Sequence, residues 1–146
     1  MPLFLTEMSR GISRRRLGLY PHAREVLDEL HSRYPLAVVT DAQSAYARAE
    51  LHRVRLLGYF DPIIVSGDYG FRKPDRRLFQ FALDAMNVAA ENVVYVGNDM
   101  HRDIFGAQQA GMTTVMVDSD QGKKSYDDCV PDYTITDLRE LLTIFQ

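Results

Sequence analysis

Two acidic residues follow an apolar run in the stretch from Asn92 to Gly111, NVVYVGNDMHRDIFGAQQAG. Val93–Val96 is typical of a buried parallel strand, and Asp99 and Asp103 come after it, where a helical pattern begins and continues to Gly111. Residues four positions apart share one face of a helix, so the two carboxylates suit a hard cation such as Mg²⁺. The alternative is that both aspartates only cap the helix and complement its dipole.

Other candidate residues lie in the segments that follow short apolar runs. Thr40 and Asp41 end the run Leu36–Val39, and Lys73 lies in the turn-rich loop SGDYGFRKP after Ile63–Val65. In a parallel sheet every strand delivers its following loop to the same edge, so these residues converge with the acidic pair. A hydroxyl group, an ammonium group and carboxylates that hold Mg²⁺ together indicate a site for a phosphoryl group. Taken singly, Thr40 is typical of a strand end and Lys73 of an exposed side chain.

The elements that must position these residues alternate between strands and helices. The apolar spacing predicts helices beginning near Pro21, Ser44, Asp75 and Asp137, and a further strand over Thr113–Val117. Such alternation implies right-handed crossovers onto a parallel sheet that is covered on both faces. The predicted fold class is therefore α/β, a doubly wound, Rossmann-like parallel sheet.

Length and composition restrict the classes of protein. The 146 residues are enough for one domain, and a net charge of -3 gives no electrostatic case for binding nucleic acid. The single cysteine, Cys129, has no partner for an internal disulfide. The chain shows neither an apolar run of ~18 residues nor the basic start of a signal peptide, which predicts a cytoplasmic protein without a membrane partner.

The polar segments, taken in order, resemble the haloacid dehalogenase-like hydrolases, which are mainly phosphatases. VVTD, with Thr40, is similar to the second motif of the family, FRKP, with Lys73, to the third, and VGNDMHRDI to the fourth, acidic motif. PDYTITDLRELL resembles the closing strand and helix of that fold. The resemblance covers about residues 19–146, and it implies a magnesium-dependent phosphatase core.

The sequence departs from the family pattern at the first motif. That motif is an Asp-x-Asp pair at the end of the first strand, whose leading Asp accepts the phosphoryl group, and nothing before Tyr20 resembles it. The only Asp-x-Asp in the chain, Asp118-Ser119-Asp120, follows the Thr113–Val117 run, which the resemblance places near the sheet edge, so we interpret it as a decoy.

Two smaller departures affect the other motifs. Asp41 replaces a more usual Asn, and Asn98 stands where many members have a metal-binding Asp. We expect Asp99 to supply that carboxylate instead, and the resemblance then implies Asp99, Asp103 and Asn98 as the metal ligands.

Without the first motif, the core is predicted to lack its usual central strand. Three outcomes would repair the gap: the neighbouring strands close up, Leu3–Leu5 fills the position, or a partner chain does. We favour a fourth interpretation, in which residues 1–19 are the remnant of a helical cap or a linker, 20–146 form the core, and an N-terminal segment is missing.

The resulting functional hypothesis is a magnesium-dependent phosphatase of small phosphorylated metabolites that is inactive as a lone chain. In this hypothesis Lys73 and Thr40 are catalytic, and Thr40, Asp41 and Lys73 bind the substrate. The alternative is a non-catalytic domain of the same family, as a homodimer or as one part of a split enzyme. Hydrolytic dehalogenation, a reaction of the same family, does not need Mg²⁺ and is less consistent with the acidic pair.

Overall fold

A computed structural model describes residues 21–41, 48–49, 51–52, 55, 57–119 and 122–146, together with the backbone of 3–6. No helix within these ranges is both long enough and apolar enough to cross a bilayer. The elements run in the order β1, α1, β2, β3, α3, β4, α4, β5, β6 and α5, with short 3₁₀ and π-helical turns between some of them.

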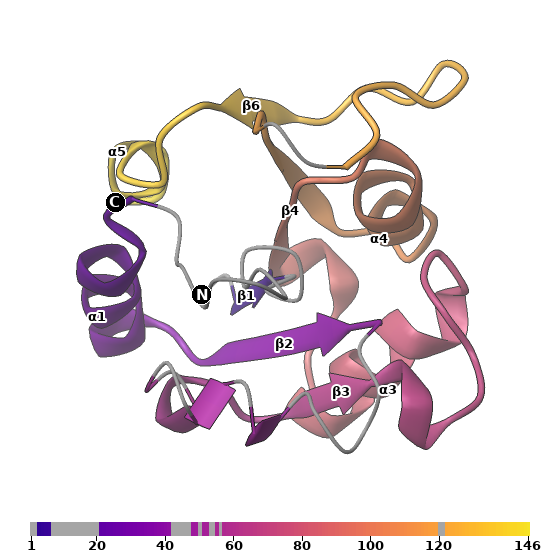
Figure 1. Cartoon of the computed structure of the whole chain (residues 1–146), viewed down its shortest axis with the longest axis horizontal. Helices are drawn as coiled ribbons and strands as arrows, with labels where there is room; N and C mark the ends of the chain where they lie inside the picture. Colours follow the sequence, from indigo (N-terminus) through magenta and orange to yellow (C-terminus); the bar gives the residue numbers. More distant parts are fainter. Residues whose placement is uncertain are drawn as a thin grey trace.

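The described strands form one six-stranded sheet in the order β3-β2-β1-β4-β5-β6, with every neighbouring pair parallel (Figure 1). The strands are β1 (Leu3–Thr6), β2 (Leu36–Thr40), β3 (Ile63–Val65), β4 (Val93–Gly97), β5 (Thr113–Val117) and β6 (Tyr133–Ile135). The doubly wound parallel sheet that the sequence predicted is therefore present, and β2 to β5 coincide with the predicted apolar runs to within one residue.

The prediction that the core lacks its central strand is wrong. β1 lies between β2 and β4, with Leu5 opposite Ala37 of β2 and Tyr95 of β4. Backbone N–H and C=O groups of two interior strands need partners, and the short run Leu3–Thr6 supplies them, which was one of the three weighed outcomes. Residues 1–2 and 7–19 of the proposed cap remnant lie outside the described residues, so that part of the interpretation stays a prediction.

Helices cover both faces of the sheet, because alternate residues of each strand point to opposite sides. α1 (Ala23–Arg33) and α5 (Glu140–Ile144) lie on one face, while α3 (Arg76–Met86) and α4 (Gly106–Gln109) lie on the other (Figure 1). Val38 packs in the core cluster of the first face, and its neighbour Val39 packs in the cluster of the second. Val94 and Tyr95 of β4 divide between the faces in the same way.

Two helices predicted from the sequence need comment. Most of the helix predicted over 44–57 lies outside the described residues, although Arg48, Ala49, Leu51 and His52 are helical. The predicted helix after β4 begins as a π-helical turn over Met100–Phe105 and becomes α-helical only in α4. This wider turn begins directly after Asp99 and contains Asp103, the two acidic residues of the fourth motif.

Candidate active site

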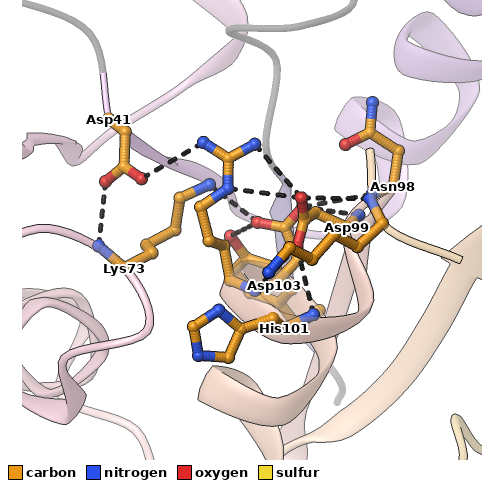
Figure 2. Close-up of polar contacts among 9 residues, drawn as sticks. Asp41, Lys73, Asn98, Asp99, His101 and Asp103 are labelled. Carbon is orange, nitrogen blue, oxygen red and sulfur yellow. Dashed lines mark hydrogen bonds and ion pairs between the residues drawn. The ribbon is translucent and has the colours of Figure 1, made fainter. Parts of the chain in front are cut away.

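The candidate residues lie where parallel strands end at the same edge of the sheet. β2 ends at Thr40 and is followed by Asp41, β3 leads into the loop that carries Lys73, and β4 leads into Asn98 and Asp99. In open α/β sheets this edge is where ligands bind. Figure 2 shows Asp41 and Lys73 on one side of this edge and Asp99 and Asp103 on the other.

A buried ion pair joins the loops after β3 and β4. Lys73 Nζ lies 2.7 Å from Asp103 Oδ1, and the two side chains are only 2% and 1% exposed. Burial lowers the pKa of the Lys73 ammonium group, while the charge of Asp103 and its hydrogen bond act in the opposite direction. The pair therefore fixes a lysine at the edge of the sheet, and the alternative of an exposed side chain, which describes Lys73 taken singly, does not apply.

Asp103 accepts three further hydrogen bonds, which hold its carboxylate in one orientation. The Tyr95 hydroxyl donates to Oδ1 at 3.2 Å, and the backbone N–H groups of Asn98 and Asp99 donate to Oδ2 at 3.1 Å. Burial and the neighbouring carboxylate raise the pKa of Tyr95 well above its usual value, so the hydroxyl acts as a donor. A Cβ atom on Gly97 would come within 2.4 Å of Asp103 Cβ, so this close approach requires glycine.

Asp99 caps the π-helical turn. Its Oδ1 accepts from the backbone N–H groups of His101 and Arg102, and its Oδ2 accepts from the backbone N–H of Lys123 at 3.2 Å. Burial would raise the pKa of Asp99, but these hydrogen bonds and the charge of Arg102 outweigh it and lower the pKa. The capping alternative that the sequence left open therefore describes Asp99, whereas Asp103 pairs with Lys73 instead.

The loop over 122–124 is held close to the acidic motif. The backbone N–H of Met100 donates to the carbonyl oxygen of Lys123 at 2.8 Å. Gly122 has a φ of 78°, and a Cβ atom there would lie 2.2 Å from the carbonyl oxygen of Asn98. A glycine is needed for both reasons, and it lets this loop cover one side of Asp99.

Arg102 links the ends of β2 and β4. Its guanidinium donates to Asp99 Oδ2 from Nε at 3.3 Å and from Nη2 at 3.1 Å, and its Nη1 lies 3.9 Å from Asp41 Oδ2. Asp41 Oδ1 accepts from the backbone N–H of Lys73 at 2.9 Å. Burial raises the pKa of Asp41, and the Lys73 N–H and the nearby arginine charges only partly oppose this effect.

The other residues singled out from the sequence are Thr40, Asn98 and the Asp118-Ser119-Asp120 segment. Thr40 is buried at the end of β2, and its position at the edge follows from its strand. Asn98 is buried as well and contributes its backbone N–H to Asp103, while Figure 2 shows its amide group pointing away from that carboxylate. In the decoy segment Asp118 is exposed and lies 3.5 Å from Lys124, and Asp120 lies outside the described residues.

Sequence reasoning did not single out Arg102 or Tyr95, although each had a usable signal. Arg102 follows Asp99 by three positions, a spacing at which oppositely charged helical side chains meet. Tyr95 is a hydroxyl-bearing residue inside an otherwise aliphatic strand, and a buried hydroxyl usually finds a partner.

The described arrangement does not fit a magnesium ion. The oxygen atoms are of the right chemical type, since Mg²⁺ takes carboxylate and water ligands. Both oxygens of Asp103 and both oxygens of Asp99 nevertheless accept hydrogen bonds from N–H or O–H groups. Among the residues that the structure describes, no group of three His, Cys, Asp or Glu side chains could hold a metal ion.

Comparison with known proteins shows which family the chain belongs to. The sequence model of the haloacid dehalogenase-like hydrolases matches residues 2–117. A glyceraldehyde 3-phosphate phosphatase of Methanocaldococcus jannaschii is 36% identical over 126 residues, which are 86% of this chain and 55% of the relative. A phosphoserine phosphatase of Thermus thermophilus is 38% identical over 130 residues, which are 88% of this chain and 51% of the relative.

A solved structure shows the same fold with a metal ion. The HAD-hydrolase YfnB of Bacillus subtilis, bound to magnesium, superposes with a TM-score of 0.82 at 29% identity, over 88% of this chain and 57% of that chain. The doubly wound parallel sheet defines an α/β fold, and the chain belongs to the family of haloacid dehalogenase-like hydrolases. It spans about half the length of the curated relatives it matches.

Proposed function

We propose that this chain is the α/β core of a phosphatase for small phosphorylated metabolites, and that the chain by itself does not turn such substrates over. The observation that carries the proposal is the buried pair of Lys73 and Asp103, 2.7 Å apart, at the edge where ligands bind in this fold. The substrate class is supported by the two relatives, which are named for glyceraldehyde 3-phosphate and for phosphoserine.

In this proposal the residues at the edge bind and orient a phosphoryl group. The ammonium group of Lys73 offsets the negative charge of the phosphoryl oxygens, and Asp103 keeps that ammonium in place. The hydroxyl of Thr40 and the backbone N–H of Asp41 are the donors that would hold the remaining oxygens. None of these groups can replace a carboxylate nucleophile, because the family reaction passes through a phosphoryl-aspartate.

The proposed absence of turnover is supported by the residues at the end of β1. The central strand ends at Thr6, and the sequence continues with Glu7 and Met8, so no Asp-x-Asp stands at this position. Asp118, in the decoy segment, is exposed beside Lys124 at the end of a different strand. Removing a covalent catalyst typically costs several powers of ten in rate, which would leave the chain close to the uncatalysed reaction.

Magnesium remains a prediction for this chain. The relative with bound magnesium supports it, while the hydrogen bonds to Asp99 and Asp103 oppose it in the described arrangement. The homodimer and the split enzyme also remain predictions, although the described residues leave no gap between β2 and β4 for a partner chain to fill.

The test measures hydrolysis of p-nitrophenyl phosphate by the purified chain in the presence of Mg²⁺. We expect no turnover above background from the unaltered chain, and a gain of turnover when Thr6→Asp and Met8→Asp place a carboxylate pair at the end of β1. Adding Lys73→Met should abolish that gain, whereas Arg77→Gln, on the exposed surface, should not. Turnover by the unaltered chain that Lys73→Met abolishes would contradict the proposed inactivity.

A further inference from the structure

A pocket opens at the edge of the sheet opposite to the candidate active site. It lies between the end of α1, the start of β2 and the 3₁₀ turn Leu57–Tyr59, and its volume is about 400 Å³. Pockets that bind small molecules commonly measure roughly 300–1,000 Å³, with mainly apolar and aromatic walls and a few polar groups. Leu36 at the start of β2 lines the pocket and Thr40 ends the strand, so the two sites stand at opposite ends of β2 (Figure 1).

Three aromatic residues contribute to the wall of the pocket. Tyr34 and Phe60 are only 6% and 5% exposed, so their rings are anchored in the core, and Tyr59 is half-buried. The Tyr59 hydroxyl donates to Asp28, and the rings of His31 and Tyr59 meet edge to face with their centroids 5.5 Å apart. The rings are therefore held in place without a ligand, and the face of an aromatic ring attracts a cation.

The end of α1 adds carbonyl oxygens that have no protein partner. Pro35 has no N–H to donate to the carbonyl oxygen of His31, four positions earlier. Within the part of the chain that the structure describes, the carbonyl oxygens of His31, Ser32 and Arg33 accept no backbone hydrogen bond. The carbonyl groups of a helix point toward its C-terminal end, where their partial negative charge favours a cation. The last turn of α1 lines the pocket, so this partial charge acts there.

The side chains around the pocket leave a carboxylate without a counter-ion. The Arg33 guanidinium is already paired with Glu29, one turn earlier in α1, with Nε 3.1 Å from Oε1. The exposed carboxylate of Asp61 makes no ion pair with any described residue, while the backbone N–H of Asp61 donates to the carbonyl oxygen of Leu36 at 2.9 Å. The Asp61 carboxylate, the helix carbonyl groups and the aromatic rings therefore all favour a positively charged ligand.

We propose that this pocket binds a small organic cation, a primary ammonium group on a compact apolar body. The ammonium group has three donors, which match the Asp61 carboxylate and the carbonyl oxygens at the end of α1. The apolar body lies against the rings of Tyr59 and Phe60, which keeps it out of water. The inference does not rest on the proposed phosphatase function, because none of the candidate active-site residues lines the pocket.

The test titrates the full chain with 2-phenylethylamine, 2-phenylethanol and phenylacetate, which are similar in size and are positive, neutral and negative at pH 7. Binding is followed by the ¹H–¹⁵N NMR signals of the backbone amides. We expect the amine to bind at least about tenfold more tightly than either other probe. The largest shifts should occur at Ser32, Gly58 and Asp61, which line the pocket, and the signal of Asp99 at the opposite edge should not move. Equal binding of amine and alcohol, tighter binding of phenylacetate through Arg33, or shifts confined to other residues would overturn the proposal.

Two variants separate the contributions of charge and ring. Asp61→Asn changes an exposed side chain and should lose at least about threefold in affinity for the amine, with no change for 2-phenylethanol. Tyr59→Leu keeps an apolar side chain but removes a ring, and it should also weaken amine binding. Asp84→Asn is the matched control, because Asp84 is an exposed aspartate of α3, on the other face of the sheet. Unchanged amine affinity in Asp61→Asn, or an equal loss in Asp84→Asn, would contradict the proposal.

Discussion

Removing one partner of the buried pair should destabilise the chain far more than removing both. In Lys73→Met, the carboxylate of Asp103 stays buried and keeps only its hydrogen bonds from Tyr95, Asn98 and Asp99, at 3.1 to 3.2 Å. Breaking a buried ion pair typically costs about 3–5 kcal/mol. Because three donors remain, we expect this variant to lie near the lower end, at about 3 kcal/mol.

Asp103→Asn should cost more, about 4–5 kcal/mol. The four donors around Asp103 are divided between its two oxygens, and an amide offers only one oxygen, so two donors would face an NH₂ group. The double variant, Lys73→Met with Asp103→Asn, contains neither buried charge. We expect it to be less destabilised than the sum of the two single variants by about 2 kcal/mol or more.

Urea unfolding followed by circular dichroism measures these differences, provided that the slope with urea is the same for all four proteins. Arg77→Gln, which removes an exposed cation paired with Asp75, should change the free energy of unfolding by less than about 1 kcal/mol. A cost below about 1 kcal/mol for Lys73→Met, or single costs that simply add, would refute the inference that Lys73 and Asp103 form a buried pair.

Three other perturbations test the fold around the site. Gly97→Ala places a Cβ atom 2.4 Å from Asp103 Cβ and should lower the free energy of unfolding by about 1–3 kcal/mol in urea. Leu5→Pro removes a backbone donor from the interior strand β1 and should abolish cooperative thermal unfolding. The Arg77 side chain and backbone lower the pKa of Asp75 from 3.8 to about 2, so the stability that Asp75 contributes is present above pH ~4 and is lost as the pH falls toward 2.

Each of these three has a matched control. Gly58→Ala should change the free energy of unfolding by less than about 0.5 kcal/mol, because nothing lies within 4 Å of a Cβ atom there. A change as small as this for Gly97→Ala would contradict the close approach of Gly97 to Asp103. Leu5→Val keeps the backbone donor and should unfold cooperatively. Cooperative unfolding of Leu5→Pro would contradict the position of β1 at the centre of the sheet. Asp75→Asn keeps a capping side chain without the titration, so its acid unfolding curve should be flatter than that of the unaltered chain between pH ~4 and 2.

The sequence predicted β4 and β5, two interior strands of the sheet, well for a physical reason. Parallel strands that are buried on both faces appear as continuous apolar runs, so Val93–Val96 and Thr113–Val117 were recognisable without knowledge of their partners. The convergence of Asp41, Lys73 and Asp103 followed from strand direction alone, since parallel strands end at one edge.

The central strand could not be predicted in the same way. Leu3–Thr6 is only four residues long, and its β conformation depends on pairing with β2 and β4, which are distant in the sequence. The role of Arg102 could not be predicted for a related reason. Its spacing from Asp99 predicts a local ion pair, whereas its approach to Asp41 depends on where a different strand, β2, ends.

The position of β1 also explains why a long side chain connects Asp99, after β4, with Asp41, after β2. Adjacent strands lie ~4.8 Å apart, so β2 and β4, with β1 between them, are separated by roughly 10 Å. An aspartate is too short to cross that distance, and the link between the two strand ends is made by a long cationic side chain, that of Arg102, which binds Asp99 and reaches toward Asp41. A four-residue strand thus sets the span that a contact between the ends of β2 and β4 has to cover.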